Sequence, residues 1–309
     1  MPKLLSWARR RLQALAPTKH RPDAASAAIL PPAATTLVAI AKTEGRYLPE
    51  WIAFHLSIGI DRILVYDNDS SDDGAAIVRA LEGRFPVHGV SWPSGEHESP
   101  QLAAYADALK RAARSEWVLF IDIDEFAVPF GYSDWPAFLA TLPPDVSCVG
   151  LNTRVFGSSG RVADDYDLVL KTFTRCSAPG FAFNRHIKTL ARPGDVAEMF
   201  IHHAVLRSGR AVDSALADLV LPLPGRTAMP VFDGIQINHY QSKTYDEFVR
   251  RRGKGDANVN PAHAAKMARR ATREGFDYID RNDVEDRSLA PFLAAFERQY
   301  AEVRAVLDR

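Results

Sequence analysis

The sequence contains little cysteine and no long apolar run. Its 309 residues include only Cys148 and Cys176. Two thiols leave one disulfide open as an alternative, but they cannot form the disulfide framework of a small secreted domain. No stretch approaches the roughly 20 consecutive apolar residues that cross a bilayer as a helix. These features are typical of a reducing compartment, so we predict a cytoplasmic location.

The sequence also lacks an excess of charge of either sign. Its 38 Lys and Arg residues balance its 38 Asp and Glu residues, so nothing in the overall charge favours a nucleic-acid partner, and we expect none. Hydrophobic residues make up 47% of the chain, which is enough for a sizeable core. The length predicts one catalytic domain of about 200–250 residues with extensions.

The N-terminal 21 residues differ from the rest, because they carry basic residues and no acidic ones. The basic residues are Lys3, Arg9, Arg10, Arg11, Lys19 and Arg21, and the apolar residues that would form a stripe on a short helix are Leu4, Leu5, Trp7, Leu12 and Leu15. Two interpretations stay open: peripheral contact with anionic lipid on the inner membrane face, or a solvated basic tail. We assign residues 1–35 to this tail and a linker.

From residue 36 onward, strand-like and helix-like patterns alternate. Strands are predicted over residues 36–42, 61–69, 85–92 and 117–124, and helices over residues 46–59, 70–83 and 99–116. This β-α-β alternation favours an α/β fold with a mostly parallel sheet flanked by helices. We assign residues 36–145 to a nucleotide-binding half.

After about residue 145 the alternation weakens. Strand-like runs are predicted over residues 148–160, 167–175 and 231–240, and helices over residues 245–255, 261–275 and 289–307. We therefore predict an acceptor half over residues 146–245, which completes a domain of residues 36–245. Residues 246–309 are predicted to form a C-terminal helical extension.

Polar side chains follow three of the predicted strands at their carboxyl ends. They are Lys42, Thr43 and Glu44, then Asp67, Asn68, Asp69 and Ser70, and finally Asp122, Asp124 and Glu125. In a parallel sheet these ends meet at one edge, where ligands bind. The Asp-X-Asp spacing suits a Mg²⁺ or Mn²⁺ ion that is also bound by substrate phosphates. The alternative is a solvated acidic turn or a helix cap.

Three sequence blocks resemble the family 2-like and family 92-like nucleotide-sugar glycosyltransferases. They are "AKTEGRYLPEWIAFHLSIGIDRILVYDNDSSDDG", "WVLFIDIDEF" and "INHYQSKTYDEFVRRRGKG", and "FGSSG" is a weaker fourth match. The resemblance covers roughly residues 36–255. It implies the GT-A fold and transfer of a sugar, with inversion, from a nucleoside diphosphate donor to an acceptor hydroxyl. It further implies Mn²⁺ or Mg²⁺ as cofactor, a UDP-sugar as the leading donor, and a role in surface glycan or glycoconjugate synthesis.

The resemblance also implies roles for individual residues. The nucleotide and its phosphates would be bound by Glu44, Asp67, Asn68, Asp122 and Lys243, and the metal by Asp122, Asp124 and His239. His202 follows a "K-x-x-x-R-P" stretch that runs from Lys188 to Pro193. For the general base that accepts the acceptor's proton, the candidates are Asp233 and His202, with Glu198 a weaker third.

Two other functions stay open. In haloacid dehalogenase-type phosphatases an Asp-X-Asp also follows an apolar strand, but there it ends the first core strand, and a Thr or Val stands where this chain has Phe126. The second alternative is a non-catalytic module that binds a nucleotide or glycan. His55 lies on the apolar face of its predicted helix, and we expect it to be a core residue.

Overall fold

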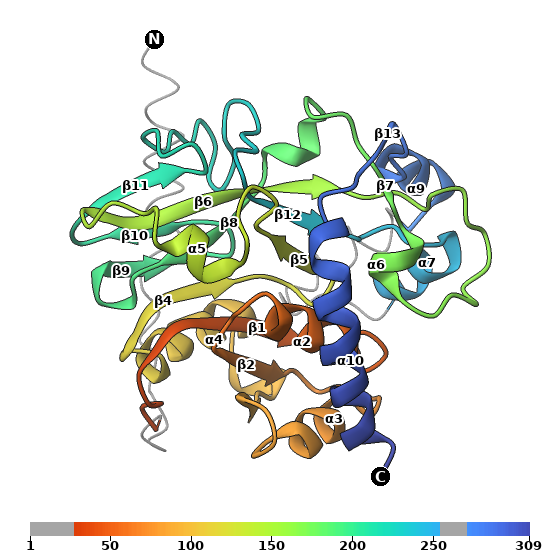
Figure 1. The fold of residues 1–309 in the computed structure, drawn as a ribbon, viewed down its shortest axis with the longest axis horizontal. Helices are drawn as coiled ribbons and strands as arrows, with labels where there is room; N and C mark the ends of the chain where they lie inside the picture. Colours follow the sequence, from red (N-terminus) through yellow and green to blue (C-terminus); the bar gives the residue numbers. More distant parts are fainter. Residues whose placement is uncertain (1–27, 254–270) are drawn as a thin grey trace.

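The structure, a computed structural model, describes residues 28–253 and 271–309. These residues form an α/β fold with a nine-stranded sheet in the order β3-β2-β1-β4-β8-β6-β12-β5, and β11 pairs with β6 (Figure 1). The sheet strands are β1 Ala33–Ala41, β2 Arg62–Asp67, β3 Val87–Ser91, β4 Ser115–Phe120, β5 Glu125–Val128, β6 Val146–Val155, β8 Ile187–Ala191, β11 Arg210–Asp213 and β12 Gln236–His239. The predicted N-terminal tail and most of the helix predicted over residues 261–275 lie outside the described residues.

Helices flank the sheet and occupy most of the connections in the first half of the chain. The α-helices are α2 Leu48–Ser57, α3 Gly74–Leu81, α4 Pro100–Arg111, α5 Trp135–Leu139, α6 Val169–Thr172, α7 Tyr245–Gly253, α9 Arg273–Ile279 and α10 Leu293–Leu307. Short 3₁₀ helices are η1 Ser94–Glu96, η2 Ala182–Arg185, η3 Pro193–Asp195 and η4 Ala290–Phe292. Two small antiparallel strand pairs lie outside the main sheet. One consists of β7 Arg175–Cys176 and β13 Val284–Glu285, and the other of β9 Val196–Met199 and β10 Ala204–Leu206. The predicted α/β class is confirmed.

The sheet is mixed rather than purely parallel. Strands β3, β2, β1 and β4 pair in parallel, as the β-α-β alternation predicts. β8 then pairs antiparallel with both β4 and β6, and β5 pairs antiparallel with β12. Because β8 reverses direction between two strands, β6 and its parallel neighbours β12 and β11 run the same way as β4.

One predicted strand is a helix instead. Residues 167–175 contain α6, and the buried carboxylate of Glu50 accepts hydrogen bonds from the N–H groups of Val169 and Leu170, both at 2.8 Å. These N–H groups belong to the first turn of α6, where a helix has no partners of its own. A long-range contact from α2 therefore stabilises a helix that the local sequence does not reveal.

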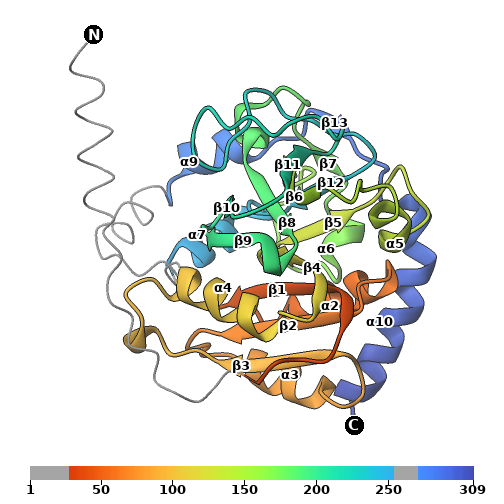
Figure 2. The same cartoon turned by 90° about the vertical axis from the view of Figure 1, so that its left-hand side faces the viewer.

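Successive residues of the central strands face opposite sides of the sheet. Leu37 and Ala39 of β1 join the core cluster that contains residues of α2, α3 and α10, whereas Val38 and Ile40 join the cluster that contains residues of α4. Figure 2 shows α4 and α10 on opposite sides of the sheet. Both faces are covered, which explains why these strands are apolar throughout.

The C-terminal helix α10 packs along α2 and α3 (Figure 1). Its residues Phe296 and Val303 are fully buried. The end of the chain therefore contributes to the core beside the predicted nucleotide-binding half. The division of the chain into a tail, a domain with two halves and an extension stays a prediction.

Both cysteines are free and buried. Burial raises the pKa of the Cys148 thiol to about 12, so this thiol stays protonated at neutral pH. None of the helices described in the structure is long and apolar enough to cross a membrane.

His55 is a core residue, and its burial predicts a pH-dependent stability. Its Nδ1 donates to the carbonyl of Trp51 at 2.8 Å, its Nε2 accepts from the N–H of Ala127 at 3.2 Å, and burial lowers its pKa to about 3. Because the unfolded chain binds this proton below about pH 6.5 and the folded chain does not, stability falls with falling pH. By pH 5 this one group costs about 2 kcal/mol.

We therefore expect His55→Gln to weaken the pH dependence. The variant should be less stable than the wild type at pH 7, but it should lose less free energy of unfolding between pH 7 and pH 5. Urea unfolding at several pH values measures both quantities. Equal losses in the two proteins would show that His55 is not neutral in the folded state.

Candidate functional site

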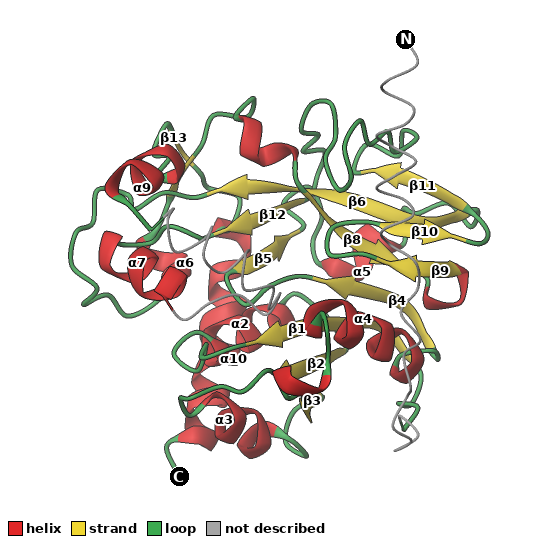
Figure 3. Cartoon of the chain, turned by 180° about the vertical axis from the view of Figure 1, so that it is seen from behind, coloured by secondary structure: helices red, strands yellow, loops and turns green. Residues whose placement is uncertain are grey.

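The carboxyl ends of β1, β2, β4, β6 and β12 lie at one edge of the sheet, which we call the rim. The last residues of β1 and β2, Ala41 and Asp67, are register partners, and the N–H of Ile121 after β4 donates to the carbonyl of Val38. His239 at the end of β12 is opposite both Val155 and Glu125. Figure 3 shows β6 and β12 pointing toward the side where α7 and α9 lie.

Three carboxylates lie at the rim between β4 and β5. The side chains of Asp124 and Glu125 are 2% and 1% exposed, and that of Asp122 is 30% exposed. Burial of ionised carboxylates is costly unless cations lie nearby. Each of the three has such a partner in the structure.

Lys188 on β8 neutralises two of the carboxylates. Its Nζ lies 2.7 Å from Oδ2 of Asp122 and 2.8 Å from Oε2 of Glu125, and its side chain is 1% exposed. Burial alone would lower the pKa of Lys188, but the two carboxylates outweigh it and raise this pKa above its ordinary value. Burial would likewise raise the pKa of Asp122, but Lys188 holds it below its usual range. Lys188 is therefore a permanent cation of the site.

Asp124 is surrounded by groups from β12, α7 and the loop between them. Its Oδ2 lies 2.8 Å from a guanidinium nitrogen of Arg251 and 3.3 Å from Nε2 of His239. Burial opposes ionisation, but Arg251, His239 and then Lys243 hold the pKa of Asp124 well below its usual range. The carboxylate is thus ionised at neutral pH.

Asp124 and His239 carry buried polar atoms that make no hydrogen bond within the described residues. These atoms are both carboxylate oxygens of Asp124 and Nε2 of His239. His239 Nδ1 lies 3.5 Å from Oε1 of Glu125, so the Nδ1 side of the imidazole ring faces Glu125 and the Nε2 side faces Asp124. A carboxylate oxygen is a suitable ligand for Mn²⁺ or Mg²⁺, and a neutral imidazole nitrogen is a common ligand of divalent transition metals. These two side chains therefore fit a divalent ion that is completed by other oxygens.

Asp122 does not join Asp124 and His239 in a ready-made metal centre. Its Oδ2 is bound by Lys188, and its Oδ1 accepts a hydrogen bond from Gln101 at 3.3 Å. No cluster of three or more His, Cys, Asp or Glu side chains in the described part of the chain is arranged to hold a metal. An ammonium group thus lies beside Asp122 where the shared metal ion was expected, and the assignment of Asp122 as a metal ligand stays a prediction.

Lys243 lies close enough to Asp124 and Glu44 to interact electrostatically with both. It is buried, and its Nζ lies 4.3 Å from the ring centre of Tyr47. Burial lowers its pKa, and the negative charges of Asp124 and Glu44 oppose this effect. Lys243 is therefore placed between the residues expected to bind metal and those expected to bind nucleotide.

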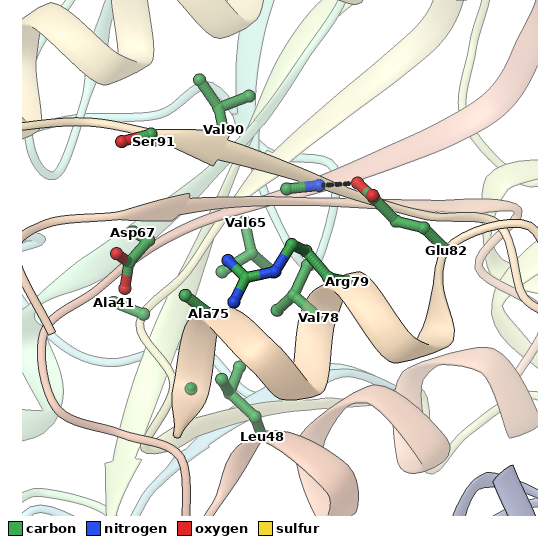
Figure 4. Close-up of a pocket in the computed structure, with 12 residues that line it drawn as sticks. Ala41, Leu48, Val65, Asp67, Ala75, Val78, Arg79, Glu82, Val90 and Ser91 are labelled. Atoms are coloured by element: carbon green, nitrogen blue, oxygen red, sulfur yellow. Dashed lines mark hydrogen bonds between the residues drawn. The ribbon is translucent and has the colours of Figure 1, made fainter. Parts of the chain in front are cut away.

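Asp67 borders a cavity of about 290 Å³ between α3 and the sheet. Figure 4 shows Asp67 and Ser91 at one end of it, and Val65 and Val78 on its walls. The neighbouring Asn68 is buried, and its amide donates to the carbonyl of Trp92 at 2.9 Å. The cavity thus begins at the carboxyl ends of β2 and β3 and is mostly apolar.

The two candidate bases lie at opposite edges of the sheet. His202 is close enough to Asp122, Lys188 and His239 to interact electrostatically with each, and its Nδ1 makes no hydrogen bond within the described residues. Asp233 is exposed and precedes β12, whereas the rim is at the end of that strand. The strand alone separates Asp233 from His239 by at least about 10 Å.

Asp233 therefore lies away from the rim, and its role as the base stays a prediction. The weaker candidate Glu198 is exposed on β9. The sequence could not settle this point, because β12 has polar residues at both ends and its direction depends on its pairing with β6.

Backbone strain is concentrated at the rim. Five non-glycine residues among those described have a positive φ, and three of them, Thr43, Asp69 and Lys243, follow β1, β2 and β12. Such conformations are unfavourable for residues with a Cβ and persist where the surrounding structure requires them, often at functional sites. The Thr43 N–H donates to Oγ of Ser70 at 2.9 Å, which joins the loops after β1 and β2.

Sequence reasoning did not assign Lys188 or Arg251 to the site. Lys188 was noted only as the start of "K-x-x-x-R-P". Arg251 is one of three consecutive arginines, for which the sequence leaves a solvated helix face and phosphate binding equally open. Both contact the Asp-X-Asp residues through pairings that are distant in the sequence. The sequence contained one signal for such cations: three carboxylates lie close together after a buried strand with no cation beside them in the sequence.

Comparisons with solved structures return proteins of low similarity. A crystal structure of S. aureus TarS in complex with UDP-GlcNAc is 16% identical, covers 88% of this chain and 83% of its own, and has a TM-score of 0.39. The mannosyltransferase PcManGT from Pyrobaculum calidifontis, in complex with GDP-Man and Mn²⁺, is 17% identical, covers 99% of this chain and 81% of its own, and has a TM-score of 0.37. These likenesses are too distant to carry an argument about this chain.

Sequence comparisons are more informative. A glycosyltransferase family 92 protein of Ricinus communis is 30% identical over 217 residues, which is 67% of this chain and 35% of the relative. One of Oryza sativa subsp. japonica is 29% identical over 215 residues, 67% of this chain and 33% of the relative. The matched region thus spans about a third of the length of these curated relatives. Residues 41–272 match the family model of glycosyltransferase family 92. The chain belongs to glycosyltransferase family 92.

Proposed function

We propose that the protein is a metal-dependent glycosyltransferase of the GT-A kind that moves a sugar, with inversion, from a nucleoside diphosphate to an acceptor hydroxyl. The observation that carries this proposal is the buried Asp124 carboxylate, whose Oδ1 makes no hydrogen bond within the described residues and whose Oδ2 lies 3.3 Å from Nε2 of His239. Membership of family 92 and the position of the pair at the sheet rim support it.

Asp124 and His239 would hold the divalent ion, Mn²⁺ or Mg²⁺. When bound, such an ion neutralises charge that develops on a departing diphosphate. Lys243 binds phosphate from the nucleotide side, because it is a buried ammonium group close to Asp124 and Glu44. Asp122, held in place by Lys188 and partly exposed, accepts a hydrogen bond from a donor hydroxyl.

The nucleoside would bind at the carboxyl ends of β1 and β2. Asp67 borders the apolar cavity and presents a carboxylate to a base or ribose, and Glu44 and Asn68 flank it in the adjoining loops. We propose a UDP-sugar as the leading donor and a glycan or another hydroxyl compound as the acceptor. The cytoplasmic location and a role in surface glycan or glycoconjugate synthesis stay predictions, and the region expected to contact membrane lies outside the described residues.

His202 is the general base in this proposal. Burial lowers its pKa to about 3, and the positive charge of Lys188 acts in the same direction, so the imidazole is neutral across the physiological range. Its unpartnered Nδ1 can accept a proton from an acceptor hydroxyl. A bound diphosphate adds negative charge nearby, which raises the basicity of the ring when the donor is present.

His202→Gln should therefore lower kcat for transfer by about 10²- to 10⁴-fold and leave donor binding near the wild-type value. Steady-state kinetics and a nucleotide titration separate the two effects. A matched control is His203→Gln, because His203 stacks on Phe200 with ring centres 4.7 Å apart. A variant that keeps wild-type kcat would show that His202 is not the base.

The function is tested with a panel of UDP-, GDP- and dTDP-sugars, each with and without Mn²⁺. Thermal shift identifies the donor, because ligands that bind the native state raise Tm. Donor hydrolysis and transfer to candidate acceptors then test catalysis. Binding without hydrolysis or transfer would favour the non-catalytic module, and hydrolysis of a generic aryl phosphate would favour the phosphatase.

A further inference from the structure

Helix α7 holds a guanidinium group against the carboxylate that would bind the metal. Arg251 lies near the end of α7, and its nitrogen is 2.8 Å from Oδ2 of Asp124. Its side chain is 34% exposed, so the guanidinium group reaches from solvent to the buried carboxylate. The contact occupies the same carboxylate oxygen that lies 3.3 Å from His239.

The position of α7 is fixed by a second buried carboxylate. Glu247, one turn before Arg251, has a side chain that is 4% exposed and accepts hydrogen bonds from the hydroxyls of Tyr47 and Tyr166. Arg46 lies 3.3 Å from the same carboxylate. Because these contacts anchor the helix to the loop before α2 and to the loop before α6, Arg251 is held where it reaches Asp124.

The three carboxylates that follow β4 are matched in number by cationic side chains beside them. The carboxylates are Asp122, Asp124 and Glu125, and the cations beside them are Lys188, Lys243 and Arg251. A divalent ion that entered alone would add two uncompensated positive charges to a largely buried site. A divalent ion that enters with a nucleoside diphosphate brings its own negative charge, so the balance is kept.

We propose that Arg251 is a resident counter-ion of Asp124 that makes metal binding depend on the nucleoside diphosphate. This inference rests on the proposed function. Without nucleotide, Arg251 competes with the metal for the carboxylate. When metal and diphosphate bind together, the guanidinium is displaced from Asp124 and becomes available to the phosphate oxygens, for which its planar donor array is well suited.

This arrangement predicts a coupling that can be measured. If nucleotide tightens metal binding by some factor, metal tightens nucleotide binding by the same factor. Arg251→Gln removes the competitor, so Mn²⁺ alone should bind about tenfold more tightly than to the wild type. The variant also loses a phosphate contact, so UDP should bind more weakly in the presence of Mn²⁺, and the coupling factor should fall.

The experiment titrates Mn²⁺ into the full chain, with and without UDP, and follows free Mn²⁺ by electron paramagnetic resonance. The matched control is Arg250→Gln, which removes the same charge from the same helix. Arg250 is 58% exposed and pairs with Asp164 at 2.8 Å. Thermal melting checks that both variants are folded, and the control should bind Mn²⁺ as the wild type does.

Each outcome has one meaning. Tighter Mn²⁺ binding without UDP in Arg251→Gln, but not in Arg250→Gln, supports the counter-ion role. Unchanged or weaker Mn²⁺ binding in Arg251→Gln overturns it, even if UDP binding falls. A parallel titration of Asp124→Asn separates this failure from failure of the proposed function: if that variant keeps wild-type Mn²⁺ affinity with UDP, the metal site itself is wrong.

Discussion

Replacing Asp124 with asparagine should lower kcat/KM for glycosyl transfer by at least about a thousandfold. The substitution keeps the shape of the side chain and removes the charge that would hold the divalent ion. Loss of several kcal/mol of charge stabilisation on the departing diphosphate corresponds to a factor of this size. The measurement is transfer, or donor hydrolysis, with the nucleotide sugar that the thermal-shift panel identifies.

The control for this variant is Asp145→Asn. Asp145 precedes β6, so it lies at the edge of the sheet opposite the rim, and its side chain is 63% exposed beside Arg210. This change should leave the rate unaltered. Turnover near the wild-type value in a folded Asp124→Asn protein would contradict the assigned role of the carboxylate.

The second large effect concerns stability. Lys188→Met should lower the free energy of unfolding by roughly 3–5 kcal/mol, which is typical when one partner of a buried ion pair is removed. Methionine fills much of the space, but it leaves Asp122 and Glu125 without the ammonium group that lies 2.7 and 2.8 Å from them. Urea unfolding at pH 7 measures the loss.

Two further variants make this prediction decisive. Lys171→Met removes a lysine that pairs with Glu297 at the surface, where the two side chains are 46% and 53% exposed, and such pairs contribute about 1 kcal/mol or less. The double variant Lys188→Met, Glu125→Gln should recover part of the lost stability, because it removes one of the unpaired charges. If Lys188→Met costs no more than Lys171→Met, the lysine does not stabilise the carboxylates.

The sequence predicted the fold of residues 36–124 well. The β-α-β alternation of residues 36–124 is a local pattern, and parallel strands with helical crossovers follow from it directly. The same pattern placed Asp67 and Asp124 at one edge, because the carboxyl ends of parallel strands coincide. His239 was assigned through the family resemblance, and the structure places it beside Asp124.

The features that the sequence did not reveal depend on pairings that no local pattern encodes. β8 inserts antiparallel between β4 and β6, and only this pairing brings Lys188 to Asp122. Asp233 was a candidate because of its place in the turn of "VFDGI", and the sequence does not show which end of β12 lies at the rim. The sequence left Arg251 open as a solvated residue or a phosphate ligand, and its contact with Asp124 depends on the anchoring of α7 by Glu247.

The most direct test of the account is pulsed electron paramagnetic resonance of Mn²⁺ bound to the full chain together with UDP. If Asp124 and His239 hold the ion against the diphosphate, the spectra should show hyperfine coupling to an imidazole nitrogen and to phosphorus. The nitrogen coupling should disappear in His239→Asn. Bound Mn²⁺ that couples to phosphorus but to no imidazole nitrogen in the wild type would contradict the proposed site.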